Sequence, residues 1–149
     1  MFIDKYQDRF DRLSNQELIE LISAEVNGAS YKVAQCCTLY LRGYHSGVMP
    51  VDSGMKEMLL PCIGFDIASG ALGHEIARLE LERLIYDIDL KPLIEKNGYS
   101  ELKIPYNKPS TWWAHLVLIY FKRNFCNKHK PDECPLKNAI GGLSYKCKK

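Results

Sequence analysis

Residues 14–43 read SNQELIELISAEVNGASYKVAQCCTLYLRG, and this stretch decides the fold class. Ser14 followed three positions later by Glu17 is typical of a capping box at the start of a helix. Apolar residues recur behind it at helical spacing until residues 27–30 break the pattern. Gly28 within that break is suited to a left-handed cap at the end of the helix. A first helix followed by a tight turn is therefore predicted.

A second helix is predicted from Tyr31 to Arg42, with Gly43 ending it. Its interior face is expected to consist of four residues: Val33, Ala34, Cys37 and Leu41. Two helices joined by about four residues form a helical hairpin.

Helical signals continue after the hairpin. A short extended stretch at 48–51 leads to Asp52, which is expected to cap a helix that runs through Lys56 to about Leu60 and is stopped by Pro61. The amphipathic segment from Gly73 to Tyr86 is expected to turn four residues inward: Ile76, Leu79, Leu84 and Ile85.

Three elements complete the predicted fold. Pro92 is expected to open a short helix that Gly98 closes, and residues 101–109 are expected to form a loop. Ser110 is expected to cap a central buried helix that runs to about Phe125. Strand signals are weak, so the predicted fold class is all-α, a single helical domain over residues 1–149. Within it the hairpin spans about 14–42, and a cysteine-containing basic tail spans about 126–149.

Composition and charge narrow the class of protein. The 149 residues suit one domain with an ordinary core, and the longest apolar run is far shorter than the roughly 20 residues of a membrane helix. No export leader opens the sequence, so we expect an intracellular protein, cytoplasmic if the source is prokaryotic. The six cysteines are then expected to be thiols or metal ligands. Residues 121–149 carry eight basic and two acidic side chains, which suits either phosphate contacts or a solvated tail.

Several motifs, taken in order, resemble the helix-hairpin-helix DNA glycosylases, the family that includes endonuclease III and the 8-oxoguanine glycosylases. Residues 26–34, VNGASYKVA, resemble the family pattern Leu-Pro-Gly-Val-Gly-x-Lys-Thr-Ala. Residues 50–55, PVDSGM, resemble its Pro-Val-Asp-Thr-His-Val. Residues 113–116, WAHL, lead to Cys126 and then to CPL at 134–136, which is similar to the family's closing helix and cysteine-rich end. The resemblance implies the second, C-terminal half of an endonuclease III-like fold.

The resemblance also implies two catalytic residues. Lys32 matches the lysine that attacks the anomeric carbon of the sugar and forms a Schiff base, which permits strand cleavage. Asp52 matches the aspartate that stabilises the cationic sugar and helps to activate the nucleophile. The implied activity is a base-excision glycosylase with AP-lyase activity.

Double-stranded DNA is the implied partner. The family anchors a phosphate on backbone N–H groups of the hairpin, which here corresponds to Asn27, Gly28, Ala29, Ser30 and Tyr31. Ser30 stands where the family usually has a second glycine, and its Cβ restricts close approach to the backbone.

The cysteine-rich end departs from the family. Iron–sulfur members carry Cys-x6-Cys-x2-Cys-x5-Cys, and only the first and third ligands are matched here. The sequence therefore leaves two interpretations of this site. The first interpretation is a degenerate site that holds no cluster, and the alternative is a zinc ion bound by Cys126, His129, Cys134 and Cys147.

Family enzymes have further helices before the hairpin, whereas about 13 residues precede the first matched helix here. Two hypotheses follow. One is an active glycosylase, with a pocket that a second subunit could complete. The other is a non-catalytic DNA-binding or partner-binding module that retains a truncated glycosylase fold. The first requires the Lys32 amine and the Asp52 carboxylate to face one solvent-reachable cleft.

Overall fold

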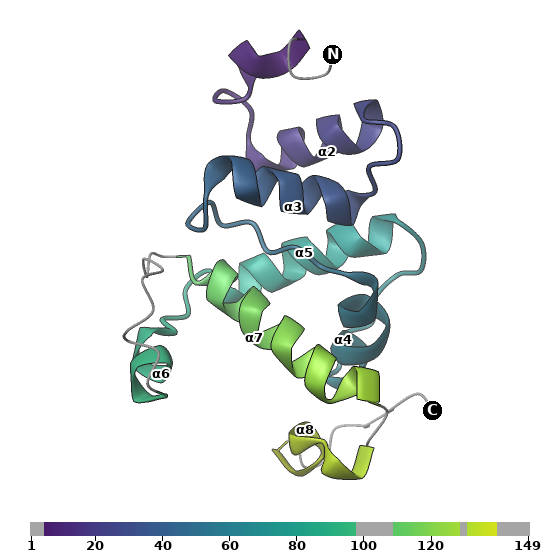
Figure 1. The fold of residues 1–149 in the computed structure, drawn as a ribbon, viewed down its shortest axis with the longest axis vertical. Coiled ribbons are helices and arrows are strands. Elements are labelled where there is room, and N and C mark those ends of the chain that lie inside the picture. Colours follow the sequence, from purple (N-terminus) through teal and green to yellow (C-terminus); the bar gives the residue numbers. More distant parts are fainter. Residues whose placement is uncertain (1–4, 98–108, 129–130, 140–149) are drawn as a thin grey trace.

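The computed structural model of the chain describes residues 5–97, 109–128 and 131–139. The described residues form helices and contain no strand, which confirms the all-α class. A helical pair lies at one end of an elongated molecule and α8 at the other, with α5, α7 and α4 between them (Figure 1). The elements are η1 Gln7–Arg9, α2 Asn15–Glu25, α3 Tyr31–Arg42, η2 Met55–Leu59, α4 Leu60–Cys62, α5 Leu72–Ile85, α6 Lys91–Lys96, α7 Thr111–Asn124, η4 Cys126–Lys128, η5 Pro131–Glu133 and α8 Pro135–Ala139. No described helix has the length and apolar character that crossing a membrane requires.

The predicted helical hairpin is present as α2 and α3. The Glu17 N–H donates to the Ser14 hydroxyl at 3.2 Å, and the Ser14 N–H donates to the Glu17 carboxylate at 2.7 Å. Gly28 adopts a φ of 80° in the turn between the helices, a conformation that side chains disfavour. One apolar cluster joins the pair: Leu18, Ile19, Ile22, Ala34, Leu39 and Val48.

The predicted interior face of α3 is partly wrong. Ala34 is buried, but Val33 and Leu41 are exposed, and the polar residues Gln35 and Thr38 are fully buried instead. The helix is rotated because its inner face meets both α2 and the N-terminal part of α5, and α5 presents polar groups there. A count of apolar positions alone could not place this face.

Residues 48–51, the predicted extended stretch, belong to no helix, and the helix after them differs from the prediction. Residues 55–59 form a π-helix, in which the Leu60 N–H donates to the Met55 carbonyl five residues back. The helix then runs past Pro61 to Cys62, so Pro61 does not end it. Pro61 stands directly after the π-helix, at the first positions of α4.

The predicted interior face of α5 is also wrong for three of its four residues. Ile76, Leu79 and Leu84 are exposed and Ile85 is partly buried. The buried residues of this helix are Gly73, Glu75, Ala77, Arg78 and Leu81. Arg78 and its partners Glu75 and Glu82 occupy the inner face of α5 as a charged network, and the apolar residues lie on the outer face.

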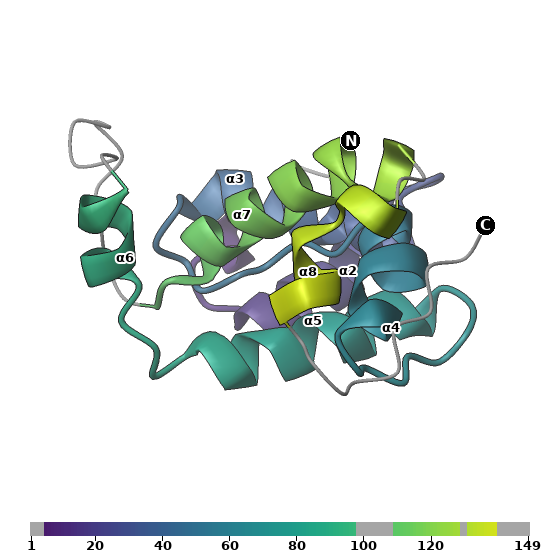
Figure 2. The same ribbon diagram turned by 90° about the horizontal axis from the view of Figure 1, so that it is seen from below.

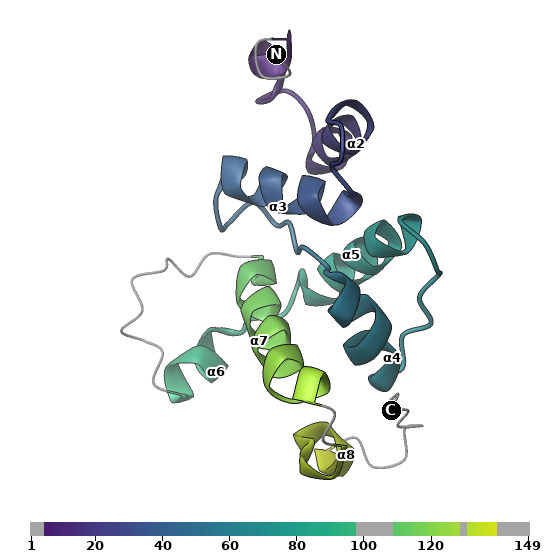
Figure 3. The same cartoon turned by 45° about the vertical axis from the view of Figure 1, so that its right-hand side comes forward.

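The last helices position the second half of the core. Leu60, Ala77, Leu81 and Ala114 belong to a cluster shared by α4, α5 and α7. Figure 3 shows α4, α5 and α7 close together below α3. Ser110 is the N-cap residue of α7, as predicted, but its side chain makes no capping bond within the described residues, and its hydroxyl donates to the Ile88 carbonyl at 3.0 Å. Figure 2 shows α6 standing apart from the other helices. Gly98, residues 101–108 of the predicted loop and the tail beyond residue 139 lie outside the described residues.

Candidate active site

An open pocket of about 510 Å³ lies where the start of α3, the end of the extended stretch, α5 and α7 meet. Its lining residues are Ser30, Tyr31, Lys32, Asp52, Ser53, Gly54, Ala71, His74 and Lys122. Lys32 and Asp52 therefore line one solvent-reachable pocket, 20 positions apart in the chain. Seven of the nine lining residues carry side chains that can form hydrogen bonds or bear charge.

Both oxygens of the Asp52 carboxylate are bound. Oδ1 accepts a hydrogen bond from the Met55 N–H at 2.7 Å, which is the helix-capping role predicted for this residue. Oδ2 lies 2.6 Å from the Lys122 Nζ. The side chains of Asp52 and Lys122 are 24% and 11% exposed, so the ion pair is largely shielded from water.

The surroundings of Asp52 keep it ionised. Burial acts to raise its pKa, but the hydrogen bonds from Lys122 and from the Met55 N–H, together with the charges of Lys122 and Lys32, outweigh burial and lower the pKa below its ordinary value of 3.8. A fixed negative charge is therefore present in the pocket at neutral pH.

Lys32 occupies the first turn of α3 and is partly buried. Its charge lies near enough to lower the pKa of Asp52. Within the described part of the chain, no hydrogen bond or ion pair engages its amine, whereas the amine of Lys122 is bound to the carboxylate. The pocket thus holds one lysine that is bound in an ion pair, Lys122, and one whose amine has no partner among the described residues, Lys32.

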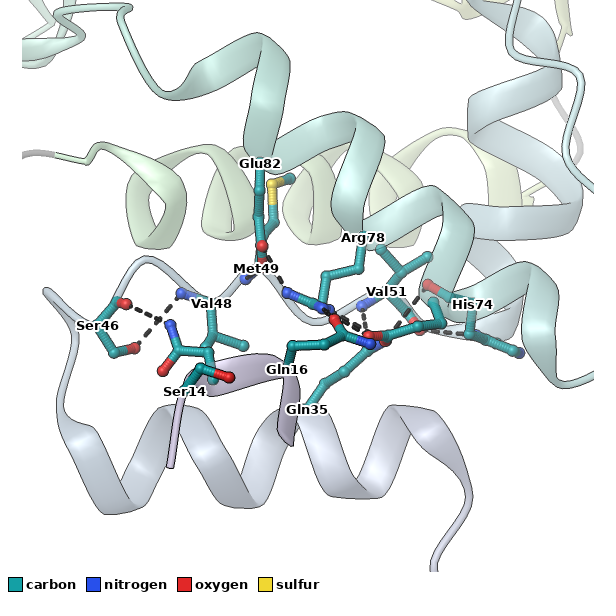
Figure 4. Close-up of polar contacts among 12 residues, drawn as sticks. Ser14, Gln16, Gln35, Ser46, Val48, Met49, Val51, His74, Arg78 and Glu82 are labelled. Carbon is teal, nitrogen blue, oxygen red and sulfur yellow. Dashed lines mark hydrogen bonds and ion pairs between the residues drawn. The ribbon is translucent and has the colours of Figure 1, made fainter. Parts of the chain in front are cut away.

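The stretch that carries Asp52 is held by side chains of the surrounding helices (Figure 4). The Val51 N–H donates to the Gln35 Oε1 at 2.9 Å, and the Met49 N–H donates to the Glu82 Oε1 at 2.9 Å. Gln35 in turn donates to the Glu75 Oε2 at 2.9 Å. These bonds link α3 and α5 to the residues directly before Asp52, and so they fix where the carboxylate stands.

Two histidines bind the same stretch. His74 and His115 each place Nδ1 2.8 Å from a carbonyl, that of Val51 and that of Pro50 respectively. A carbonyl can only accept, so each Nδ1 carries the proton when the ring is neutral. Burial lowers the pKa of His115, and this effect exceeds the opposing influence of the Pro50 carbonyl and of Asp52. His115 is therefore neutral at pH 7.

The hairpin turn borders the pocket through Ser30 and Tyr31. Asn27, Gly28 and Ser30 are exposed, and the Ser30 hydroxyl makes no capping bond to α3 within the described residues. The Ala29 N–H, however, donates to the Val26 carbonyl at 2.9 Å. Of the N–H groups expected to hold a phosphate, that of Ala29 is thus already used inside the turn.

Neither Cys126 nor Cys134 lines this pocket. Cys126 and Cys134 are both buried, whereas His129 and Cys147 lie outside the described residues. Among the described residues, no three or more side chains of the metal-binding types come together.

Lys122 and His74 are the pocket residues that sequence reasoning missed. Lys122 follows a long apolar run and reads as an ordinary basic residue at a helix end. The one local sign of Lys122 was the glycine at position 54, two residues after Asp52. A side chain at that position would collide with the side chain of Lys122.

Comparison with known proteins gives no further assignment: no protein-family model, no curated protein and no solved structure matches the chain significantly.

Proposed function

We propose that the protein is a DNA glycosylase with AP-lyase activity, in which Lys32 is the nucleophile and Asp52 the catalytic carboxylate. The observation that carries the proposal is their shared pocket: an amine without a partner among the described residues lies beside a fixed carboxylate. The helix-hairpin-helix resemblance, including the truncated endonuclease III-like fold that it implies, supplies the reaction class.

The lyase step follows from the chemistry of the amine. At an abasic site, the neutral Lys32 amine adds to the aldehyde carbon of the opened sugar. Loss of water then leaves a carbon–nitrogen double bond, the Schiff base. Removal of a proton from the neighbouring carbon breaks the bond to the 3′ phosphate, which leaves as the anion. A lysine that is bound in an ion pair is a poorer nucleophile, and this favours Lys32 over Lys122.

The glycosylase step needs a negative charge near the sugar. When the bond between base and sugar breaks, positive charge develops on the sugar, and a fixed carboxylate stabilises it electrostatically. Asp52 suits this role because it remains ionised well below neutral pH and because both of its oxygens are held.

The hairpin provides a means of holding DNA. Ser30 and Tyr31 lie between the exposed turn and the pocket, so a phosphate bound at the N-terminus of α3 would place the neighbouring sugar near Lys32. Such a contact reads no sequence, and it predicts binding that weakens as salt is raised.

Borohydride trapping tests the lyase step. The wild type is expected to form a covalent adduct with duplex DNA that contains one abasic site, and Lys32→Ala is expected to lose it. Lys91→Ala is the matched control, because Lys91 is an exposed lysine on α6 that pairs with Glu95. Equal trapping by Lys32→Ala and the wild type would contradict the proposal.

The non-catalytic alternative makes a different prediction. A module that only binds DNA would show salt-dependent duplex binding without any adduct, and Asp52→Asn would leave that binding unchanged. The two hypotheses also differ in base release from duplexes that carry a single damaged base: the glycosylase releases the base, and the non-catalytic module does not.

A further inference from the structure

An ion pair joins two residues of the pocket, Asp52 and Lys122, which are 70 positions apart in the chain. Lys122 lies in the last turn of α7, and Asp52 ends the extended stretch. The Lys122 side chain is 11% exposed, which is unusual for a lysine, and its Nζ is 2.6 Å from the Asp52 Oδ2. Burying this amine costs desolvation that only a close partner can offset.

Gly54 provides the space through which Lys122 reaches the carboxylate. A Cβ at this position would lie 2.7 Å from the Lys122 Cδ and 3.0 Å from its Nζ. The backbone at Gly54 has a φ of −70° and a ψ of −33°, an ordinary helical conformation that any residue adopts. The missing side chain is therefore explained by the approach of Lys122 rather than by backbone freedom.

We propose that Lys122 is a positioning residue: it fixes the orientation of the Asp52 carboxylate through Oδ2 and leaves Lys32 as the lysine that reacts. This inference rests on the proposed function and assigns a role to a residue outside the resemblance. Lys122 is not itself the nucleophile, and it acts on the reaction through Asp52.

Four groups on three helices bear on the charge of Asp52. Lys32 lies on α3, His74 on α5, and Lys122 and His115 on α7. Of these groups, the charges of Lys122 and Lys32 are the ones that lower the pKa of Asp52. Of the two, Lys122 makes the direct hydrogen bond, and removing it should affect Asp52 more than removing Lys32.

The first test follows the Asp52 carboxylate itself. Side-chain carboxyl resonances are titrated by NMR in the wild type, in Lys122→Met, in Lys32→Met and in the surface control Lys91→Met. The Asp52 pKa is expected to rise most in Lys122→Met, less in Lys32→Met and not at all in the control. An unchanged Asp52 pKa in Lys122→Met would overturn the inference.

The second test displaces Lys122 without removing its charge. Gly54→Ala places a methyl group against a flexible side chain, so Lys122 must move while the backbone can stay. Alanine also favours a helix more than glycine does. Gly54→Ala is therefore expected to raise the Asp52 pKa while the protein stays folded. A pKa equal to that of the wild type would show that the approach of Lys122 does not matter.

The third test uses borohydride trapping across pH. Loss of the positioning contact is expected to slow trapping about 10- to 100-fold in Lys122→Met. The acid limb of the pH profile should move to higher pH, and Lys122→Arg should recover part of the rate. Wild-type rates and profile in Lys122→Met would overturn the positioning role. A wild type that traps no DNA would instead overturn the proposed function, and the Asp52 titration would still decide whether Lys122 fixes the carboxylate.

Discussion

Replacing Arg78 with methionine would test whether a buried charged network holds the site in place. The guanidinium lies 2.5 Å from the Glu75 Oε1 and 2.5 Å from the Glu82 Oε2, and it also donates to the Gln16 side chain. The side chains of Arg78 and Glu75 are only 2% and 4% exposed. Methionine is shorter than arginine but unbranched and bulky, so the substitution removes the charge and leaves most of the volume.

The expected loss can be worked out from what remains. Removing one partner of a buried ion pair costs about 3–5 kcal/mol, since the other charge stays buried. Here Glu75 keeps its bond from Gln35, and Glu82 keeps its bond from the Met49 N–H. The loss should thus lie near the lower limit, at about 3 kcal/mol, a large part of the 5–15 kcal/mol of a typical domain.

Urea unfolding followed by tryptophan fluorescence measures this loss, and its pH dependence identifies the cause. Burial acts to raise the pKa of Glu75, but its bonds to Arg78 and Gln35 outweigh this and keep the pKa below its ordinary value of 4.5 in the wild type. Without Arg78, burial should dominate and raise it. An acid whose pKa is raised by folding destabilises the folded state as pH rises through that pKa. The difference between the two proteins should therefore grow from pH 4 to pH 7.

A loss below about 1 kcal/mol that does not change with pH would refute this reasoning, because the buried acids would then not depend on Arg78. Arg78→Lys provides a second variant if Arg78→Met does not fold. It keeps the charge but lacks the planar group that binds three side chains, and an intermediate loss is expected.

Two further substitutions test the packing and the electrostatics. Gly73→Ala should lower the thermal midpoint by the equivalent of about 1–3 kcal/mol, because the new Cβ would lie 1.9 Å from the Ala68 carbonyl oxygen. A higher midpoint would show that the helix propensity of alanine outweighs this clash. His115→Gln should weaken the pH dependence of urea unfolding between pH 7 and pH 5. Burial lowers the pKa of His115 below 6.5, so the unfolded chain takes up the proton first as pH falls. Stability is therefore lost below that pH, by at most about 1.4 kcal/mol per pH unit. If the unfolding free energy of the variant depends on pH as steeply as that of the wild type, the ring is not buried and neutral.

Local signals were sufficient for the hairpin and for one side of the pocket. The capping pair of Ser14 and Glu17, the glycine at 28 and the helical spacing between them specify α2, the turn and α3 without information from elsewhere in the chain. Asp52 was identifiable for a similar reason, since a carboxylate before a helix has a defined local role and here accepts from the Met55 N–H.

The inner faces of α3 and α5 could not be predicted by counting apolar residues. Glu75, Arg78 and Glu82 share one face of α5, and a charged face is ordinarily solvated. They are buried or largely buried here because each charge finds a partner on the same helix, on α2 or on the extended stretch. The apolar side chains of α5 are then left on the outside. Lys122 escaped prediction for the same physical reason: its partner lies 70 residues away, and only the folded chain brings the two together.

The extended stretch before Asp52 is bound in a way that ties the carboxylate to several helices at once. In a sheet, its backbone groups would pair with a neighbouring strand. Here Met49 and Val51 donate to side chains of α5 and α3, and the carbonyls of Pro50 and Val51 accept from histidines on α7 and α5. Every one of these contacts comes from a helix that also supplies a residue near Asp52. A shift of any of the three helices therefore moves the carboxylate relative to the amine of Lys32. It follows that changes well outside the pocket should alter its chemistry in proportion to how far they loosen this stretch.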